Sequence, residues 1–176
     1  MALDPSHIMT GIALVTAAAA CVTDIRMRRV PNALTFSSAA IGIAANVWLA
    51  GVNGLVWGVA GCVLGLLLFL PLFALRGLGG GDVKLLAAFG ASIGPRLVFW
   101  TALYGAIAGG VCAVLVTLGA GLFLRTVGNV RFILTQWHVA GVSPVDGFTL
   151  DNSTSPRLPY AVPLACGLVG ALWLQA

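Results

Sequence analysis

Six apolar segments joined by short polar connections make up most of this 176-residue chain. Several of them approach the roughly 20 residues that an α-helix needs to cross a bilayer. Only 8% of the residues are charged, against about 25% in a soluble domain, so the chain has too little polar surface to cover a globule in water. We therefore predict an all-α, polytopic membrane protein with six transmembrane helices, at about residues 8–24, 34–50, 54–75, 82–94, 96–124 and 159–175.

The basic residues predict how these helices are oriented. If consecutive segments cross in alternating directions, Arg96 falls on one face and all the other basic residues fall on the opposite face. Those residues are Arg26, Arg28, Arg29, Arg76, Lys84, Arg125, Arg131 and Arg157. Because Lys and Arg accumulate in cytoplasmic loops, this second face is predicted to be cytoplasmic and both termini extracytoplasmic. We interpret the net charge of +4 as a sign of topology and not as a nucleic-acid-binding patch.

Residues 1–176 are predicted to form one membrane-embedded domain whose only sizeable polar region covers about residues 125–158. Val127, Val130 and Leu134 recur there at near-helical spacing, which favours an amphipathic helix lying at the membrane interface. The residues from 143 to 156 are rich in Ser, Thr, Asp and Pro and are predicted to form a loop.

The four cysteines, Cys21, Cys62, Cys112 and Cys166, lie in separate apolar segments, and no CxxC pair occurs. This pattern argues against a structural zinc site and against a disulfide framework. The cysteines are interpreted as small apolar fillers. We predict no metal and no cofactor.

Two of the five carboxylates, Asp24 and Asp82, lie at ends of apolar segments on the same predicted face. Ionisable residues near membrane depth are costly to keep, so each is a functional candidate. Each also has a structural explanation, since Asp24 can pair with a neighbouring arginine and Asp82 can cap a helix. However, a cap does not require the three glycines at 79–81, which allow another chain to come close to the backbone.

The fourth apolar segment is short. Its thirteen residues from Asp82 to Gly94 span roughly 20 Å, against a hydrocarbon core of about 30 Å. We therefore expect its cytoplasmic end to lie below the membrane surface. Irregular backbone at that depth is tolerated only where protein or a water-filled cavity surrounds it.

Two facing carboxylates provide a known kind of chemistry. They share protons unequally, so one can act as a base and the other as an acid. Such a pair can activate a water molecule and protonate a leaving amine. If the first and fourth helices bring Asp24 and Asp82 together, the sequence predicts a hydrolytic site.

Three ordered motifs resemble those of a known family, the type IV prepilin peptidases. Gly79-Gly80-Gly81-Asp82 with Lys84 fits their GxGD-x-K signature. Asp24 followed by Pro31-Asn32 is similar to their first-helix motif, and Pro159-Tyr160 is similar to the start of their last helix. The motifs extend from residue 24 to residue 163 and keep their order and sidedness.

The resemblance implies a membrane aspartic endopeptidase of the bacterial inner membrane, with Asp24 and Asp82 as the catalytic pair. Its expected partners are membrane lipids and a pilin or pseudopilin precursor, whose basic leader it removes at the cytoplasmic face; no nucleic acid is expected. Larger members carry paired CxxC motifs and also methylate the new N-terminus. This chain is predicted to be the short form without methyltransferase activity, similar to those of tight-adherence (Flp) pilus systems.

The remaining motif residues are assigned supporting roles. Gly79 and Gly81 are expected to keep the segment before Asp82 pliable. Lys84 is expected either to pair with an acid or to anchor at the lipid headgroups.

The proline motifs also have alternatives that the sequence leaves open. Pro31 and Asn32 are expected to begin the second helix, with direct substrate contact as the other possibility. Pro159 and Tyr160 are expected to begin the last helix. Tyr160 is expected either to hydrogen-bond near the two aspartates or to act as an interfacial aromatic.

Three other functional classes compete with the peptidase. A small transporter or channel subunit would use membrane acids for proton or cation passage, but its site is expected near mid-membrane depth. A presenilin-type intramembrane protease shares the GxGD chemistry, although the Pro-Asn and Pro-Tyr motifs point away from it. A non-catalytic assembly protein has no need of both acids.

Overall fold

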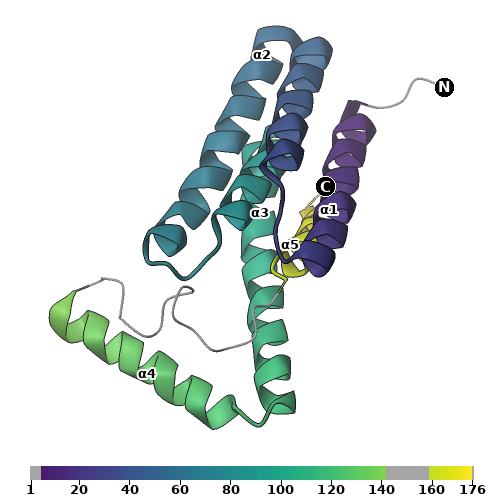
Figure 1. The fold of residues 1–176 in the computed structure, drawn as a ribbon. Coiled ribbons are helices and arrows are strands. Elements are labelled where there is room, and N and C mark those ends of the chain that lie inside the picture. Colours follow the sequence, from purple (N-terminus) through teal and green to yellow (C-terminus); the bar gives the residue numbers. More distant parts are fainter. Residues whose placement is uncertain (1–4, 142–158, 176) are drawn as a thin grey trace.

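The computed structural model describes residues 5–141 and 159–175, where helices are the only regular secondary structure. The elements are α1 (Pro5–Met27), α2 (Asn32–Ala74), α3 (Gly80–Gly119), α4 (Phe123–Ala140) and α5 (Ala161–Gln175). Helices α1, α2, α3 and α5 form a bundle (Figure 1). The all-α prediction is confirmed.

Helix α2 is a hairpin of two antiparallel halves (Figure 1). The chain reverses at Gly51, whose φ of 57° and ψ of −134° suit only glycine. After the reversal, Gly54 lies against the backbone of Asn46, and Gly58 faces Ile43. The two halves correspond to the segments predicted at residues 34–50 and 54–75.

Helix α3 reverses in the same way at Gly94, where φ is 79° and ψ is 178°, just before Pro95. Its first half, residues 80–94, corresponds to the short fourth segment. Its second half runs antiparallel to α5, since Gly105 faces Leu164 and Gly109 faces Tyr160. This half ends at Gly119, so the predicted extension to residue 124 is wrong, and α4 begins at Phe123.

The first half of α3 is the centre of the bundle. Leu85, Leu86 and Phe89 are fully buried, and nearly every residue from 83 to 94 is enclosed by other helices. Helices α2 and α5 pack against α3, while α1 packs against all three. The glycines that precede this half are half-buried. The short segment is therefore surrounded by protein.

Three helices in the described part of the chain are long and apolar enough to cross a membrane: Ser6–Met27, Asn32–Ala74 and Gly80–Gly119. Their outward faces carry large apolar side chains, including Val15, Trp48 and Leu115, which are 72%, 86% and 62% exposed. Such a surface suits lipid and not water. The chain is a membrane protein.

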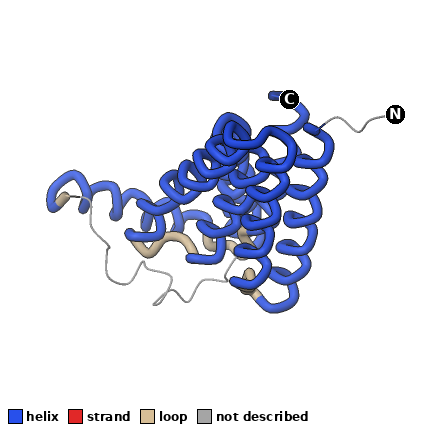
Figure 2. The backbone as a smooth tube through the Cα atoms, turned by 90° about the horizontal axis from the view of Figure 1, so that it is seen from above, coloured by secondary structure: helices blue, strands red, loops and turns tan. Residues whose placement is uncertain are grey.

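Helix α4 projects from the bundle (Figure 1), and Figure 2 shows the same arrangement from above. Among the described elements, it contacts only α3. The helix predicted around Val127, Val130 and Leu134 is present. The loop predicted at residues 143–156 lies outside the described residues.

Candidate active site

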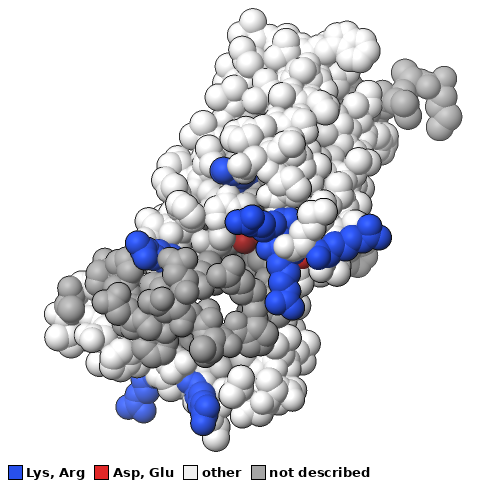
Figure 3. Space-filling model, in the orientation of Figure 1, with Lys and Arg blue, Asp and Glu red and all other residues white. Residues whose placement is uncertain are grey.

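The C-terminal end of α1 and the start of α3 lie at the same end of the bundle (Figure 1). Asp24 is in the last turn of α1, and Asp82 is in the first turn of α3. Their carboxyl groups are close enough to interact electrostatically. They are the only acids within residues 5–141 and 159–175, and the acidic surface visible in Figure 3 is surrounded by Lys and Arg side chains. The structure thus brings together the two acids that the sequence singled out.

Asp24 is buried, with 7% of its surface exposed. Its Oδ2 accepts a hydrogen bond of 3.0 Å from the backbone N–H of Ala161, the first residue of α5. The side chains of Arg26 and Arg28 are exposed, in contrast to the buried carboxylate. The partner of Asp24 is therefore the N-terminus of α5, and pairing with a neighbouring arginine does not explain why an acid occupies this position.

Asp82 closes the first turn of α3. Its backbone N–H donates to the carbonyl oxygen of Gly79 at 3.1 Å, and its Oδ2 lies 3.2 Å from the position that a Cβ on Gly79 would occupy. This position in the first turn is the one that a capping role requires, and the capping role stays a prediction. It places Asp82 at the start of the enclosed first half of α3.

The glycines before Asp82 allow close packing. None of them has a positive φ, so other residues can adopt this backbone. A Cβ on Gly81 would lie 3.4 Å from the Cβ of Val30, and one on Gly80 would lie 3.2 Å from the ring of Phe73. These short approaches bring the turn against the α1–α2 connection and the end of α2. The pliability expected of Gly79 and Gly81 stays a prediction.

Lys84 and Asn32 join two of the motifs directly. The Nζ of Lys84 donates to the Oδ1 of Asn32 at 2.9 Å and lies 5.6 Å from the centre of the Phe36 ring. One expectation was that Lys84 pairs with an acid. Its partner is instead the side-chain amide of Asn32. Pro31 is the N-cap of α2, and Asn32 is its first residue, as predicted.

Pro159 and Tyr160 directly precede α5, which begins at Ala161, slightly later than predicted. The carbonyl oxygen of Pro159 accepts from the N–H of Val162 at 3.3 Å. The Tyr160 ring meets Phe69 edge-on, with 6.1 Å between ring centres, and packs against Gly109. Tyr160 also lies within electrostatic reach of Asp82. All the predicted motif residues therefore gather at one end of the bundle.

Sequence reasoning missed two members of this site, Ala161 and Cys21. The Cys21 thiol donates to the carbonyl oxygen of Ala161 at 3.5 Å. Cys21 had been interpreted as a filler, and an alanine carries no chemical signal of its own. The one available sign was that Cys21 and Asp24 are three residues apart, which places both on one face of a helix.

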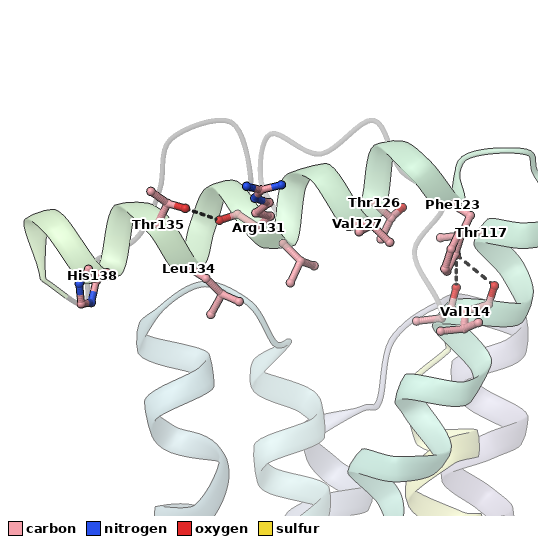
Figure 4. Close-up of a pocket in the computed structure, with 11 residues that line it drawn as sticks. Val114, Thr117, Phe123, Thr126, Val127, Arg131, Leu134, Thr135 and His138 are labelled. Atoms are coloured by element: carbon pink, nitrogen blue, oxygen red, sulfur yellow. Dashed lines mark hydrogen bonds between the residues drawn. The ribbon is translucent and has the colours of Figure 1, made fainter.

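An open cleft of about 660 Å³ lies away from these residues, between the end of α3 and α4. Figure 4 shows its lining, which includes Val114, Val127 and Leu134 and none of the motif residues. Within residues 5–141 and 159–175, no group of three or more His, Cys, Asp or Glu side chains is placed to hold a metal ion.

The fold and this site define a class: a helical membrane protein with two interacting carboxylates at one end of its bundle. A model of the type IV leader peptidase family matches residues 11–114, which is more than half of the chain and contains both aspartates. The chain belongs to the type IV leader peptidase family and is a peptidase. No curated protein and no solved structure matches it. Pro159 and Tyr160 lie outside the matched range.

Proposed function

We propose that this protein is a prepilin leader peptidase in which Asp24 and Asp82 act as a catalytic pair. The observation that carries the proposal is the position of these two acids, in the last turn of α1 and the first turn of α3, within electrostatic reach of each other and inside the range matched by the family. The substrate is the precursor of a type IV pilin or pseudopilin. The bond cleaved joins the basic leader to the mature chain.

The chemistry follows from the two carboxylates. One removes a proton from a water molecule, whose oxygen attacks the carbonyl carbon of the scissile peptide. The other donates its proton to the leaving nitrogen, so the C–N bond breaks and both products leave with their protons balanced. Burial of Asp24 among helices limits competing water and strengthens electrostatic interactions within the site.

The reversals in α2 and α3 support a topology of six crossings, because each long helix consists of two antiparallel halves. In this topology, the end that carries Asp24 and Asp82 faces the cytoplasm of a bacterial inner membrane, as the distribution of Lys and Arg indicates.

Neutralising each aspartate tests the proposal. Asp24→Asn and Asp82→Asn remove an ionisable group with almost no change in shape, and each is expected to abolish cleavage of a pilin precursor by the purified enzyme in lipid nanodiscs. Loss of the leader is followed as a size shift. Asp4→Asn, at an acid outside the motifs, is the matched control and is expected to cleave normally. Full activity in either test variant would refute the catalytic pair.

Metal removal separates this mechanism from metal-assisted hydrolysis. Incubation with a chelator is expected to leave the cleavage rate unchanged, because the carboxylates activate water without a metal. A loss of activity that added zinc restores would show instead that a metal ion takes part.

A further inference from the structure

We propose that the backbone N–H of Ala161 positions the Asp24 carboxylate for catalysis, with Cys21 holding the backbone carbonyl group of the same residue. This inference rests on the proposed function, in which Asp24 is catalytic. It assigns Cys21 and the backbone of Ala161 as positioning groups. It also gives the Pro-Tyr motif a physical role, because that motif sets where α5 begins.

Two hydrogen bonds from α1 hold the backbone of one residue, Ala161. Ala161 is completely buried, and its N–H donates to the Oδ2 of Asp24 at 3.0 Å. On the same residue, the carbonyl oxygen accepts from the Cys21 thiol at 3.5 Å. Because Cys21 and Asp24 are three residues apart in α1, they lie on one helical face and reach both polar groups of Ala161.

The hydrogen bond between Ala161 and Asp24 satisfies a general requirement of helices. The first N–H groups of an α-helix have no acceptor within that helix, and buried polar groups almost always have a partner. Ala161 is the first residue of α5, so its N–H needs an acceptor from elsewhere. Asp24 supplies that acceptor, and the interaction in turn restricts rotation of the Asp24 side chain.

The position of α5 is fixed independently of this hydrogen bond. Tyr160 is wedged between Phe69 of α2 and Gly109 of α3. Further along α5, Leu164 and Leu168 are fully buried. The N–H of Ala161 is therefore held by packing against α2 and α3, which restricts its position enough to orient a carboxylate.

The catalytic consequence concerns the two oxygens of Asp24. With Oδ2 held by Ala161, the other oxygen remains for the attacking water or for the proton shared with Asp82. A displacement of about 1 Å in a catalytic group can lower a rate by about 10²-fold. Releasing Oδ2 is therefore expected to lower kcat, while the binding of the precursor, and so KM, changes little.

Replacing one amide with an ester tests this directly. Full-length enzyme with lactic acid at position 161, made by cell-free translation into nanodiscs, lacks the N–H and keeps the alanine methyl group. We expect kcat to fall about tenfold or more and KM to stay within about twofold, as for a displaced catalytic group. The matched control is the corresponding ester at Leu164, whose N–H donates to the carbonyl oxygen of Tyr160 at 3.2 Å and not to Asp24. This control is expected to keep kcat within about twofold. Normal kcat in the 161 ester, or equal losses in both esters, would overturn the proposal.

Cys21 provides a second test with ordinary substitutions. Cys21→Ser keeps a donor and Cys21→Ala removes it, so the serine variant is expected to retain a clearly higher kcat than the alanine variant at similar KM. Cys112→Ala serves as the control for loss of a cysteine elsewhere. Equal kcat in the serine and alanine variants would show that the thiol does not support Ala161 through a hydrogen bond.

The two proposals fail in distinguishable ways. An active Asp24→Asn enzyme would refute the catalytic pair. An inactive Asp24→Asn enzyme together with a fully active 161 ester would leave the peptidase mechanism intact and refute the positioning role alone.

Discussion

The two halves of α3 have similarly apolar sequences and opposite surroundings. Residues 83–94 of the first half are almost all buried, whereas in the second half Ile107, Val111 and Leu115 are all more than half exposed. Apolar composition therefore does not tell whether a helix faces lipid or protein, because both environments are apolar. The half that carries Asp82 is the one enclosed by protein.

Small residues explain the enclosure of the first half. A Cβ on Gly61 of α2 would overlap with the backbone at Gly90, and one on Gly65 would lie 2.7 Å from the carbonyl oxygen of Leu86. Close backbone approach of this kind is the usual basis of helix association in membranes. In the second half, Gly110 has nothing within 4 Å of its Cβ position. The predictions below compare the two halves, beginning with the largest effect.

Gly90→Val is expected to disrupt the bundle, because its Cβ would overlap with the carbonyl oxygen of Gly61. We expect the free energy of unfolding to fall by about 3 kcal/mol or more, at the upper end of the cost of overpacking. Unfolding of the purified protein in mixed detergent and SDS micelles measures it. The matched variant in the second half, Gly110→Val, is expected to stay within about 1 kcal/mol, since valine is no worse than glycine in a helix. Equal losses would contradict the contrast between the halves.

Leu86→Ala and Leu115→Ala compare the same deletion in the two settings. Leu86 is fully buried, and Leu115 is 62% exposed. Because lipid is as apolar as the protein interior, each deletion costs only the packing that is lost. For Leu86→Ala we expect the free energy of unfolding to fall by about 2 kcal/mol, the low end for a core deletion. For Leu115 we expect less than about 0.5 kcal/mol. The same SDS titration applies, and a large loss at Leu115 would indicate a protein partner on that face.

Asn46→Leu removes a polar attachment of the first half. The Asn46 side-chain amide donates to the carbonyl oxygens of Gly42, Ala91 and Ser92 at 3.0–3.1 Å. Leucine has a similar shape and no hydrogen-bond donor. We therefore expect the free energy of unfolding to fall by about 1–2 kcal/mol, because the carbonyl groups lose their donor. Stability is again read by SDS unfolding. Unchanged stability would mean that these carbonyl groups find other donors.

Lys84→Met is expected to have the smallest effect on stability, within about 1 kcal/mol, because its bond to Asn32 is exposed. Its effect on activity is expected to be larger than that of Arg96→Met, the matched basic residue of the second half. Lys84 attaches the turn that carries Asp82 to α2, whereas Arg96 follows the reversal at Gly94. Precursor cleavage rates of the two variants decide this. Equal rates would remove any role for Lys84 in placing Asp82.

Much of the architecture was predictable because lipid imposes long apolar runs. The runs at residues 34–50 and 54–75 are two halves of one hairpin, and the short fourth segment ends at Gly94 as expected. The errors concern helix ends, such as the stop at Gly119, since apolar composition continues unchanged to Leu124. Among the site residues, Ala161 was beyond prediction because it acts through its backbone, which is common to every residue but proline.

The sequence alone determined that the chain is a helical membrane protein and that Asp24 and Asp82 lie on one side, because hydrophobic length and the order of segments leave few other solutions. The partners of those acids were decided by tertiary structure. Whether Asp24 would meet an arginine or the start of α5, and whether Lys84 would meet an acid or Asn32, depended on how helices distant in sequence pack. Such contacts depend on close approaches at individual glycines and on unpaired helix ends, which no local pattern of residues encodes.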